Sequence, residues 1–199
     1  MICIIDYGAG NLKSVSNAFD YIGADNIISA DRDQILAADK IVLPGVGSFG
    51  DAMDSLKNCG LVNTVYDAIE SGKPFMGICL GMQLLFEDSQ ESPGVPGLGI
   101  LRGHILRFPL DMGFKVPQIG WNDLNCRKPE SVYGCAHEKF VYFVHSYYLK
   151  ADDPGIVAAT ACYGVEFHAA IARGNLSASQ FHPEKSGQVG LSILKSWAC

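Results

Sequence analysis

Short apolar runs alternate with helical repeats of apolar residues over the first 86 positions of the chain. The apolar runs lie at residues 2–6, 27–28, 41–43 and 74–78. The helical repeats, in which apolar residues recur three or four positions apart, lie at residues 12–22, 51–58 and 61–71. Strands that alternate with helices predict an α/β fold, in which helices cover both faces of a mainly parallel sheet.

The second half of the chain has a different pattern. After Gly97, short strand-like runs are separated by glycine, proline and aspartate turns, and a final helix carries Ile193, Leu194 and Trp197. The strand-like runs lie near residues 98–107, 140–147, 156–162, 167–172 and 176–181. Because the chain contains no repeat and no linker-like segment, we predict a single domain over residues 1–199, with extra β-rich segments in its second half.

Composition narrows the class of protein. Charged residues make up 18% of the 199 positions and hydrophobic residues 48%, as in ordinary globular proteins. The formal net charge of −6 argues against broad binding to nucleic acids or to anionic membranes. No apolar run approaches the roughly 18 residues of a membrane span, and the N-terminus lacks the basic start of a signal peptide. We therefore expect a cytoplasmic protein.

The cysteines point to free thiols. There are seven of them, an odd number, and no two form a C-x-x-C pair. This usage is typical of a reducing compartment. Cys135 and His137 have the spacing of half a metal site, but no second pair has ligand spacing. We therefore expect no metal and no other cofactor.

One cysteine, Cys79, lies in a segment typical of a nucleophile elbow. An apolar strand ends at Ile78, and a stretch that we predict to be helical runs on to Phe86, so the pattern is strand, G-x-C-x-G, helix. Gly77 and Gly81 leave room for the sharp turn, and the first N–H groups of a following helix favour a thiolate. From this segment alone, a buried cysteine at the end of a core strand is an equally good interpretation.

The segment His182-Pro183-Glu184 offers a base for such a nucleophile. His182 ends a predicted strand and the proline keeps it extended, so that His182 and Glu184 project to the same side. Both then lie at the carboxyl edge of the sheet, where the elbow also lies. A carboxylate beside an imidazole fixes its tautomer, which makes Cys79, His182 and Glu184 a candidate triad. Histidines that we expect to be structural or on the surface are His104, His137 and His168.

A glycine-rich loop follows the strand at residues 41–43. Gly45, Gly47 and Gly50 match the G-x-G-x-x-G of dinucleotide-binding loops, but the match follows the third strand and lacks the acidic residue expected further on. The loop could instead turn backbone N–H groups toward a developing oxyanion, or make a tight connection between a strand and a helix. The residues alone leave these three uses open.

Taken together, these segments resemble the class I (triad-type) glutamine amidotransferases. The resemblance covers nearly the whole chain and rests on DYGAGN (6–11), LPGVGSFG (43–50), GICLGMQLLFE (77–87), KVPQIGWN (115–122), YFVHSYY (142–148) and QFHPEKSG (180–187). It implies a flavodoxin-like α/β fold. Met82 and the Pro-Gly-Val-Gly loop are similar to the branch of the family that supplies ammonia to a cyclase making imidazole glycerol phosphate and AICAR in histidine biosynthesis.

The resemblance implies a role for each matched residue. Cys79 would attack the side-chain amide of the substrate glutamine, His182 would transfer the proton, and Glu184 would hold His182. Backbone N–H groups that would bind the oxyanion belong to Leu80 and to the loop Gly45, Val46 and Gly47. Residues that would hold the amino-acid part of glutamine are Gln83, Glu91, Ser146 and Tyr147. Residues that would face a (β/α)8-barrel cyclase subunit in a heterodimer are Asn11, Trp121, Tyr142 and Lys185.

Departures from the family pattern are small. Gln118 stands in place of a usual histidine, and Ala178-Ser179 in place of a frequent glycine; neither touches the triad. Three alternatives stay open: a paralogous glutaminase that feeds a sugar-modifying amidotransferase in surface polysaccharide synthesis, a stand-alone cysteine hydrolase, and a binding module without activity.

Overall fold

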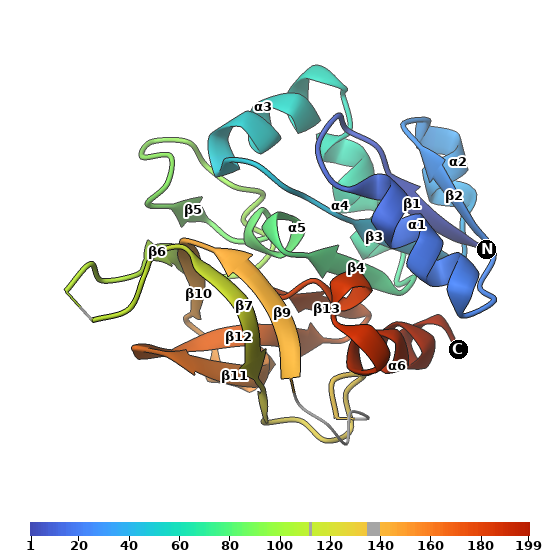
Figure 1. The fold of residues 1–199 in the computed structure, drawn as a ribbon. Helices are drawn as coiled ribbons and strands as arrows, with labels where there is room; N and C mark the ends of the chain where they lie inside the picture. Colours follow the sequence, from blue (N-terminus) through green and yellow to red (C-terminus); the bar gives the residue numbers. More distant parts are fainter. Residues whose placement is uncertain (112, 135–139) are drawn as a thin grey trace.

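Five parallel strands form one half of the central sheet (Figure 1). Their spatial order is β2 (Asn26–Ser29), β1 (Ile2–Ile5), β3 (Lys40–Leu43), β4 (Phe75–Ile78) and β13 (Leu176–Ser179). This computed structural model describes residues 1–111, 113–134 and 140–199, so Cys135 and His137 lie outside the described residues. Because the strands are parallel, the carboxyl ends of β3, β4 and β13 meet at one edge of the sheet.

Helices cover both faces of this half because its side chains alternate between two cores. Cys3 and Ile5 of β1 belong to the core that contains α2 (Arg32–Ala37), α3 (Phe49–Asn58) and α4 (Val62–Glu70). Ile2 and Ile4 belong to the core on the opposite face, with α1 (Leu12–Tyr21) and α6 (Gly187–Ala198), which lie near both chain termini in Figure 1. No helix within the described ranges is long and apolar enough to cross a membrane.

The other half of the sheet is mainly antiparallel. Beyond β13 its strands are β12 (Val165–Arg173), β10 (Tyr147–Ala151), β6 (Gly103–Arg107) and β5 (Asp88–Ser89). β11 (Val157–Tyr163) pairs with β12, and β8 (Asn125–Cys126) pairs with β11; the turn η1 (Pro154–Ile156) precedes β11. A separate ribbon pairs β7 (Gln118–Asp123) with β9 (Phe140–His145). The ribbon shares a core with this half through Phe143, Phe167 and Phe181.

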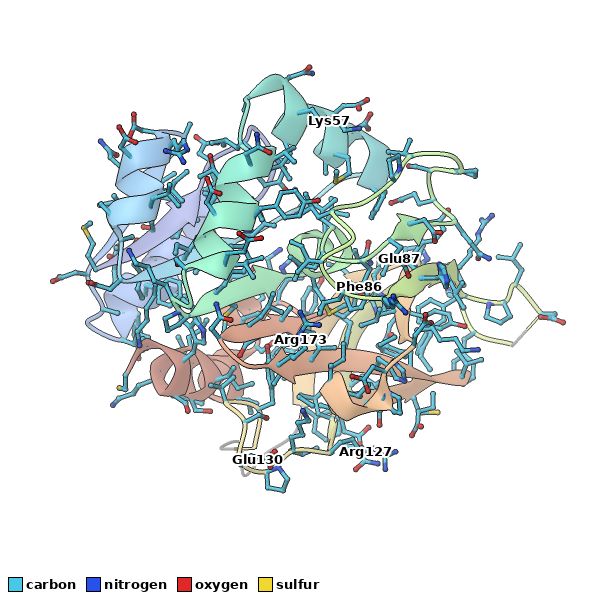
Figure 2. All side chains as sticks on the ribbon, turned by 180° about the vertical axis from the view of Figure 1, so that it is seen from behind. Lys57, Phe86, Glu87, Arg127, Glu130 and Arg173 are labelled. Atoms are coloured by element: carbon cyan, nitrogen blue, oxygen red, sulfur yellow. The ribbon has the colours of Figure 1, made fainter. Side chains whose placement is uncertain are left out.

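Figure 2 shows the molecule from behind, with the elbow segment near its middle. Phe86, at the end of that segment, lies in the interior and has no exposed surface. Lys57 and Glu130 project from opposite edges of the molecule. The elbow follows β4, which pairs with β3 on one side and with β13 on the other.

The predicted α/β fold, with a mainly parallel sheet and a strand-rich second half, is confirmed. The pattern missed α2, whose one buried residue is Ile35, and β7, whose apolar residues Ile119 and Trp121 face outward. It also missed the two-residue strand β8. The predicted helix as far as Phe86 is wrong, because α5 spans only Leu80–Gln83.

Gly81 allows the start of α5 to approach the end of β3. A Cβ atom on Gly81 would lie 1.9 Å from the carbonyl oxygen of Leu43. That oxygen belongs to a central strand, whose backbone is fixed by its neighbours on both sides and cannot move freely. The two segments are therefore in direct backbone contact.

We predict that Gly81→Ala lowers the free energy of unfolding by about 3 kcal/mol or more, because the backbone must shift to relieve this overlap. Gly94→Ala is the control: Gly94 has a φ of 85°, but a Cβ there would meet no atom within 4 Å. Only backbone strain of about 1 kcal/mol then applies. Urea unfolding followed by circular dichroism measures both losses, and equal losses would contradict the overlap.

Candidate active site

Cys79 occupies a strained turn between β4 and α5. Its backbone angles are φ 55° and ψ −111°, and no other non-glycine residue in the described ranges has a positive φ. Such a conformation costs of order 1–3 kcal/mol and persists only where the surroundings hold it. Here the Cys79 N–H donates to the Ser179 carbonyl at 2.7 Å, and the Cys79 carbonyl accepts from the Met82 N–H at 3.0 Å. The turn is thus held from β13 and from α5.

The helix that follows Cys79 is a single turn, shorter than predicted. Leu84, Leu85 and Phe86 continue as turns and are buried in the core, which accounts for the apolar run that suggested a longer helix. One turn carries little helix dipole, so the dipole argument for a thiolate is weak. The side chains around the sulfur matter more.

The imidazole of His182 and the carboxylate of Glu184 form a buried pair. Nδ1 of His182 lies 2.8 Å from Oε1 of Glu184, and the side chains are 3% and 1% exposed. The prediction of a continuous extended segment is wrong: His182 is extended (φ −97°, ψ 98°), but Glu184 belongs to the 3₁₀ turn η2 (Pro183–Lys185). This turn brings the carboxylate back to Nδ1.

The charges around His182 favour the imidazolium. Burial alone lowers the pKa of this imidazole, but its contact with the Cys79 sulfur and its bond to Glu184 raise the pKa to about 10. Nε2 has no hydrogen bond to nitrogen or oxygen in the described part of the chain, which leaves it to the sulfur. At neutral pH His182 is therefore a cation beside the sulfur, with a proton available on Nε2.

Cys79 and His182 open into a cleft that also contains most of the predicted oxyanion and glutamine-binding residues. Those in its lining are Val46, Gly47, Leu80, Gln83, Glu91, Ser146 and Tyr147. Glu184 does not line this cleft; its side chain is buried against His182. The structure thus gathers at one place segments that are up to about 140 positions apart in the sequence.

Glu91 is held at the cleft by the start of α3. Its Oε2 accepts from the N–H of Phe49 at 2.8 Å, and its own N–H donates to Oγ of Ser89 at 3.1 Å. The carboxylate is thereby fixed in place at one end. A fixed negative charge in the cleft suits a ligand that carries an ammonium group.

The glycines of the loop after β3 permit close packing against the elbow. A Cβ atom on Gly45 would lie 2.7 Å from the hydroxyl of Tyr7 and 2.9 Å from the backbone nitrogen of Gly81, and one on Gly50 would lie 2.9 Å from Oγ of Ser92. Gly47 has a φ of 102°. These contacts favour a loop that serves the elbow over a loop that binds a dinucleotide.

His145 is a cleft residue that the sequence reasoning did not single out. Its Nδ1 lies 2.8 Å from the carbonyl oxygen of Tyr147, and its Nε2 lies 3.1 Å from Oε1 of Gln118. Burial lowers the pKa of His145 to about 4, so the neutral ring carries one N–H. The Tyr147 carbonyl and Oε1 of Gln118 both only accept, so the single N–H donates to one of these two oxygens at a time. Gln118, which stands in place of a usual histidine, therefore contacts His145 in the segment that lines the cleft.

Two further residues were also missed, although both lie in segments that carry the resemblance. The hydroxyl of Tyr7 donates to the Pro44 carbonyl at 2.9 Å, across 37 positions of sequence. Nε2 of Gln180 lies 3.7 Å from Sγ of Cys79, across 101 positions. A single sequence carries no signal for such distant pairs.

The predicted partner-facing residues lie on the surface, outside the cleft lining. Trp121 is 56% exposed and pairs across the β7–β9 register with Tyr142, the ring centroids 6.2 Å apart. Lys185 lies in η2, and Asn11 caps α1 by accepting from the Ser14 N–H at 3.2 Å. Other exposed apolar residues of the ribbon are Ile119, Phe140 and Val144. The ribbon thus carries an exposed apolar strip.

A group that could hold a metal ion lies outside the cleft lining. Glu87, His104 and Asp152 are exposed, with ligand atoms within 4.8 Å of one another. Nδ1 of His104 lies 2.8 Å from Asp88, and this bond raises the pKa of His104, so a proton competes with any metal. His104 is thus a surface residue, as expected.

His168 has a structural contact, as expected. Its partly buried Nδ1 accepts from the N–H of Ala151 at 2.9 Å.

Comparisons with known proteins agree with this geometry. The chain matches the family model of glutamine amidotransferase class-I over residues 3–197. It is 49% identical to the imidazole glycerol phosphate synthase subunit HisH of Geobacter metallireducens, over 99% of this chain and 97% of that protein. It is 50% identical to the HisH subunit of Methanothermobacter thermautotrophicus, again over 99% and 97%.

Solved structures agree on the fold. PurLQS from Thermotoga maritima has a TM-score of 0.74 at 21% identity, over 98% of this chain and 95% of that chain. A crystal structure described as a glutamine amidotransferase has a TM-score of 0.76 at 18% identity and covers 100% of both chains. Since the family model and relatives about half identical extend over nearly its whole length, the chain belongs to the class-I glutamine amidotransferase family.

Proposed function

We propose that this chain is the glutaminase subunit of an imidazole glycerol phosphate synthase. It hydrolyses glutamine to glutamate and ammonia, and it passes the ammonia to a cyclase subunit in histidine biosynthesis. The observation that carries the proposal is the buried His182–Glu184 pair beside the strained Cys79, in a chain about 50% identical to HisH subunits over its full length.

The reaction follows from the arrangement of three side chains. The Cys79 thiolate attacks the side-chain carbonyl carbon of glutamine, and the carbonyl electron pair moves to oxygen. When the oxyanion collapses, the C–N bond breaks and the nitrogen takes the proton from His182, leaving as ammonia and a γ-glutamyl thioester. His182 then takes a proton from water, which attacks the thioester and releases glutamate and the thiolate. Glu184 holds His182 in the required tautomer.

The oxyanion is assigned to two backbone donors. One is the N–H of Leu80, which follows the nucleophile, and the other belongs to the loop from Gly45 to Gly47. Val46 and Gly47 line the cleft, and Gly45 packs against the elbow. Removing one such donor typically costs roughly 10²–10³ in rate.

The remaining cleft residues are assigned to the amino-acid part of glutamine. The fixed carboxylate of Glu91 suits the α-ammonium group. Gln83 and the segment Ser146-Tyr147 line the same cleft and offer hydrogen-bonding groups to the other end of the ligand. Glu91 and Gln83 are both held by hydrogen bonds to other segments, so this part of the cleft is formed before the ligand binds.

The β7–β9 ribbon is assigned to a (β/α)8-barrel partner. Trp121 and Tyr142 lie on its exposed apolar strip, and large aromatic side chains of this kind are favoured at interfaces. The backbone of Tyr142 also reaches the triad: its carbonyl accepts from the N–H of His182 at 3.0 Å. A partner that docks on β9 therefore acts within one hydrogen bond of the proposed base.

Relatives named as HisH subunits favour a histidine-pathway partner over the sugar-modifying alternative. Both alternatives use the same glutaminase chemistry, so the partner distinguishes them. The chain that co-purifies with this protein, identified by mass spectrometry, tests the assignment.

For the nucleophile, we predict that Cys79→Ala lowers glutamine hydrolysis by about 10³-fold or more and leaves the fold intact. Cys162→Ala, at an exposed cysteine, is the matched control and should keep full activity. Ammonia release by the complex with the partner and near-UV circular dichroism check both points. Substantial activity in Cys79→Ala would show that Cys79 is not the nucleophile.

For the carboxylate, we predict that Glu184→Gln lowers the rate roughly 10²-fold, less than His182→Ala does, because an amide oxygen still accepts from Nδ1 but cannot stabilise the imidazolium. The activity that needs protonated His182 falls in the wild type as the pH rises through about 10. Loss of the negative charge moves this alkaline limb to lower pH. Glutaminase pH–rate profiles measure the shift, and an unmoved limb would exclude Glu184 as the partner of His182.

For the partner, we predict that the isolated chain hydrolyses glutamine slowly, and that the barrel subunit with its nucleotide-type ligand raises kcat more than it lowers KM. Two glycines around Val46 allow the peptide planes of this loop to rotate, exchanging a carbonyl for an N–H toward the oxyanion. The isolated chain then binds glutamine but lacks part of the stabilisation of the transition state.

Steady-state assays with and without the partner measure this effect. Trp121→Ala serves as a control for docking: it should require more partner for half-maximal activation and reach a similar kcat at saturation. Full turnover by the isolated chain would mean that the oxyanion loop is permanently formed.

A further inference from the structure

The pairing of β4 with β13 places Gln180 beside the cysteine. In the parallel register Ile78 lies opposite Ser179, so the next residues along the two strands, Cys79 and Gln180, are neighbours. The N–H of Gln180 donates to the Ala169 carbonyl at 2.8 Å, which keeps the residue in the sheet. Gln180 has no exposed surface. Its amide is therefore a buried polar group that needs partners on both ends.

Those partners form a series of hydrogen bonds that ends at Sγ of Cys79. Nε2 of Gln83 donates to the Tyr147 carbonyl at 3.2 Å and to Oε1 of Gln180 at 2.9 Å. Nε2 of Gln180 lies 3.7 Å from Sγ of Cys79, within the longer range of hydrogen bonds to sulfur. The chain thus runs from a backbone carbonyl through two amides to the cysteine.

The direction of this chain is set at the carbonyl end. The Tyr147 carbonyl can only accept, so Gln83 must turn its NH2 group toward it. That group then meets the oxygen of Gln180, because two NH2 groups at 2.9 Å would repel. Gln180 is left with its own NH2 group toward Sγ. A flip of either amide breaks at least one of these contacts, which makes the donor at the sulfur a consequence of the fold.

We infer that Gln180 is a further catalytic residue, whose side-chain N–H stabilises the Cys79 thiolate, with Gln83 as the positioning residue that orients it. A thiolate is a much better acceptor than a thiol, so an obligatory donor favours the ionised sulfur. The inference rests on the proposed function, because it concerns the nucleophile of that reaction. The stabilisation is thus assigned to the side chain of the residue directly after β13, because the one-turn helix α5 supplies little of it.

The test is the pH dependence of alkylation of Cys79 by iodoacetamide in the full-length chain, with the modified peptide quantified by mass spectrometry. The rate follows the thiolate fraction, so its midpoint reports the ionisation of the sulfur. Gln180→Met keeps the length of the side chain and removes the donor. We expect its midpoint to rise by about one pH unit, the size expected for a hydrogen bond to a charged group. Gln188→Met, on the exposed surface of α6, is the matched control and should not shift.

Two more variants keep the test decisive. Gln180→Glu is isosteric and replaces the donor with an acceptor, so its midpoint should rise at least as far; it decides the matter if Gln180→Met does not fold by circular dichroism. Gln83→Met frees the amide of Gln180 to rotate and should give a smaller rise. A midpoint that matches the wild type in a folded Gln180 variant overturns the inference.

The experiment separates this inference from the proposed function. Alkylation requires neither glutamine nor the partner. A raised midpoint in a protein that does not hydrolyse glutamine would refute the glutaminase proposal and keep the contact between Gln180 and the sulfur. Normal glutamine turnover by the wild type, together with an unchanged alkylation midpoint in the Gln180 variants, would refute the role of Gln180 and keep the glutaminase proposal.

Discussion

The site depends on one constraint, the positive φ of Cys79 at the end of β4. A non-glycine residue holds this conformation only if its neighbours prevent relaxation. The bond from the Cys79 N–H to Ser179 ties the turn to β13, and the bond from Met82 to the Cys79 carbonyl ties it to α5. As a result the sulfur leaves the plane of the sheet and faces the cleft. Each other group of the site is placed relative to this turn.

β13 supplies most of those groups. Beside Cys79 it brings Gln180, and two residues later His182, before η2 returns Glu184 to the imidazole. The same segment is bound to β9 through Tyr142: its carbonyl accepts from the N–H of His182, and its own N–H donates to Oγ of Ser186 at 2.9 Å. The segment that carries the proposed base is therefore hydrogen-bonded directly to a strand of the proposed docking surface. Two hydrogen bonds thus connect the ribbon to the segment that carries His182, which supports the proposal that partner binding affects glutamine hydrolysis.

The sequence predicted those features that leave a local pattern. Alternating strands and helices, the G-x-C-x-G turn and the His-Pro-Glu segment can all be found within short windows. The failures have physical causes. Leu84, Leu85 and Phe86 are apolar because they are buried, not because they are helical, and Ile35 alone is too little to reveal a short helix.

The long-range polar contacts could not be predicted at all. The partners of Gln180, His145 and Tyr7 are set by the pairing of strands that are distant in the sequence. The neutral state of His145 and the raised pKa of His182 both depend on burial, which only the folded chain creates. Local pattern thus pointed to the proposed triad, but the electrostatic state of the site is a property of the tertiary structure.

The crowding around the elbow also limits how this chain can evolve. A Cβ on Gly45 would meet the nitrogen of Gly81, one on Gly77 would meet the oxygen of Gly81, and one on Gly81 would meet the oxygen of Leu43. Each obstacle includes a main-chain atom, so no substitution of a neighbouring side chain can make room. A second mutation in a neighbouring side chain therefore cannot compensate for a larger residue at any of these three positions. Redesign of the cleft for another amide substrate or another partner is therefore limited to its far wall and to the ribbon, because these three glycines cannot be replaced without a backbone shift.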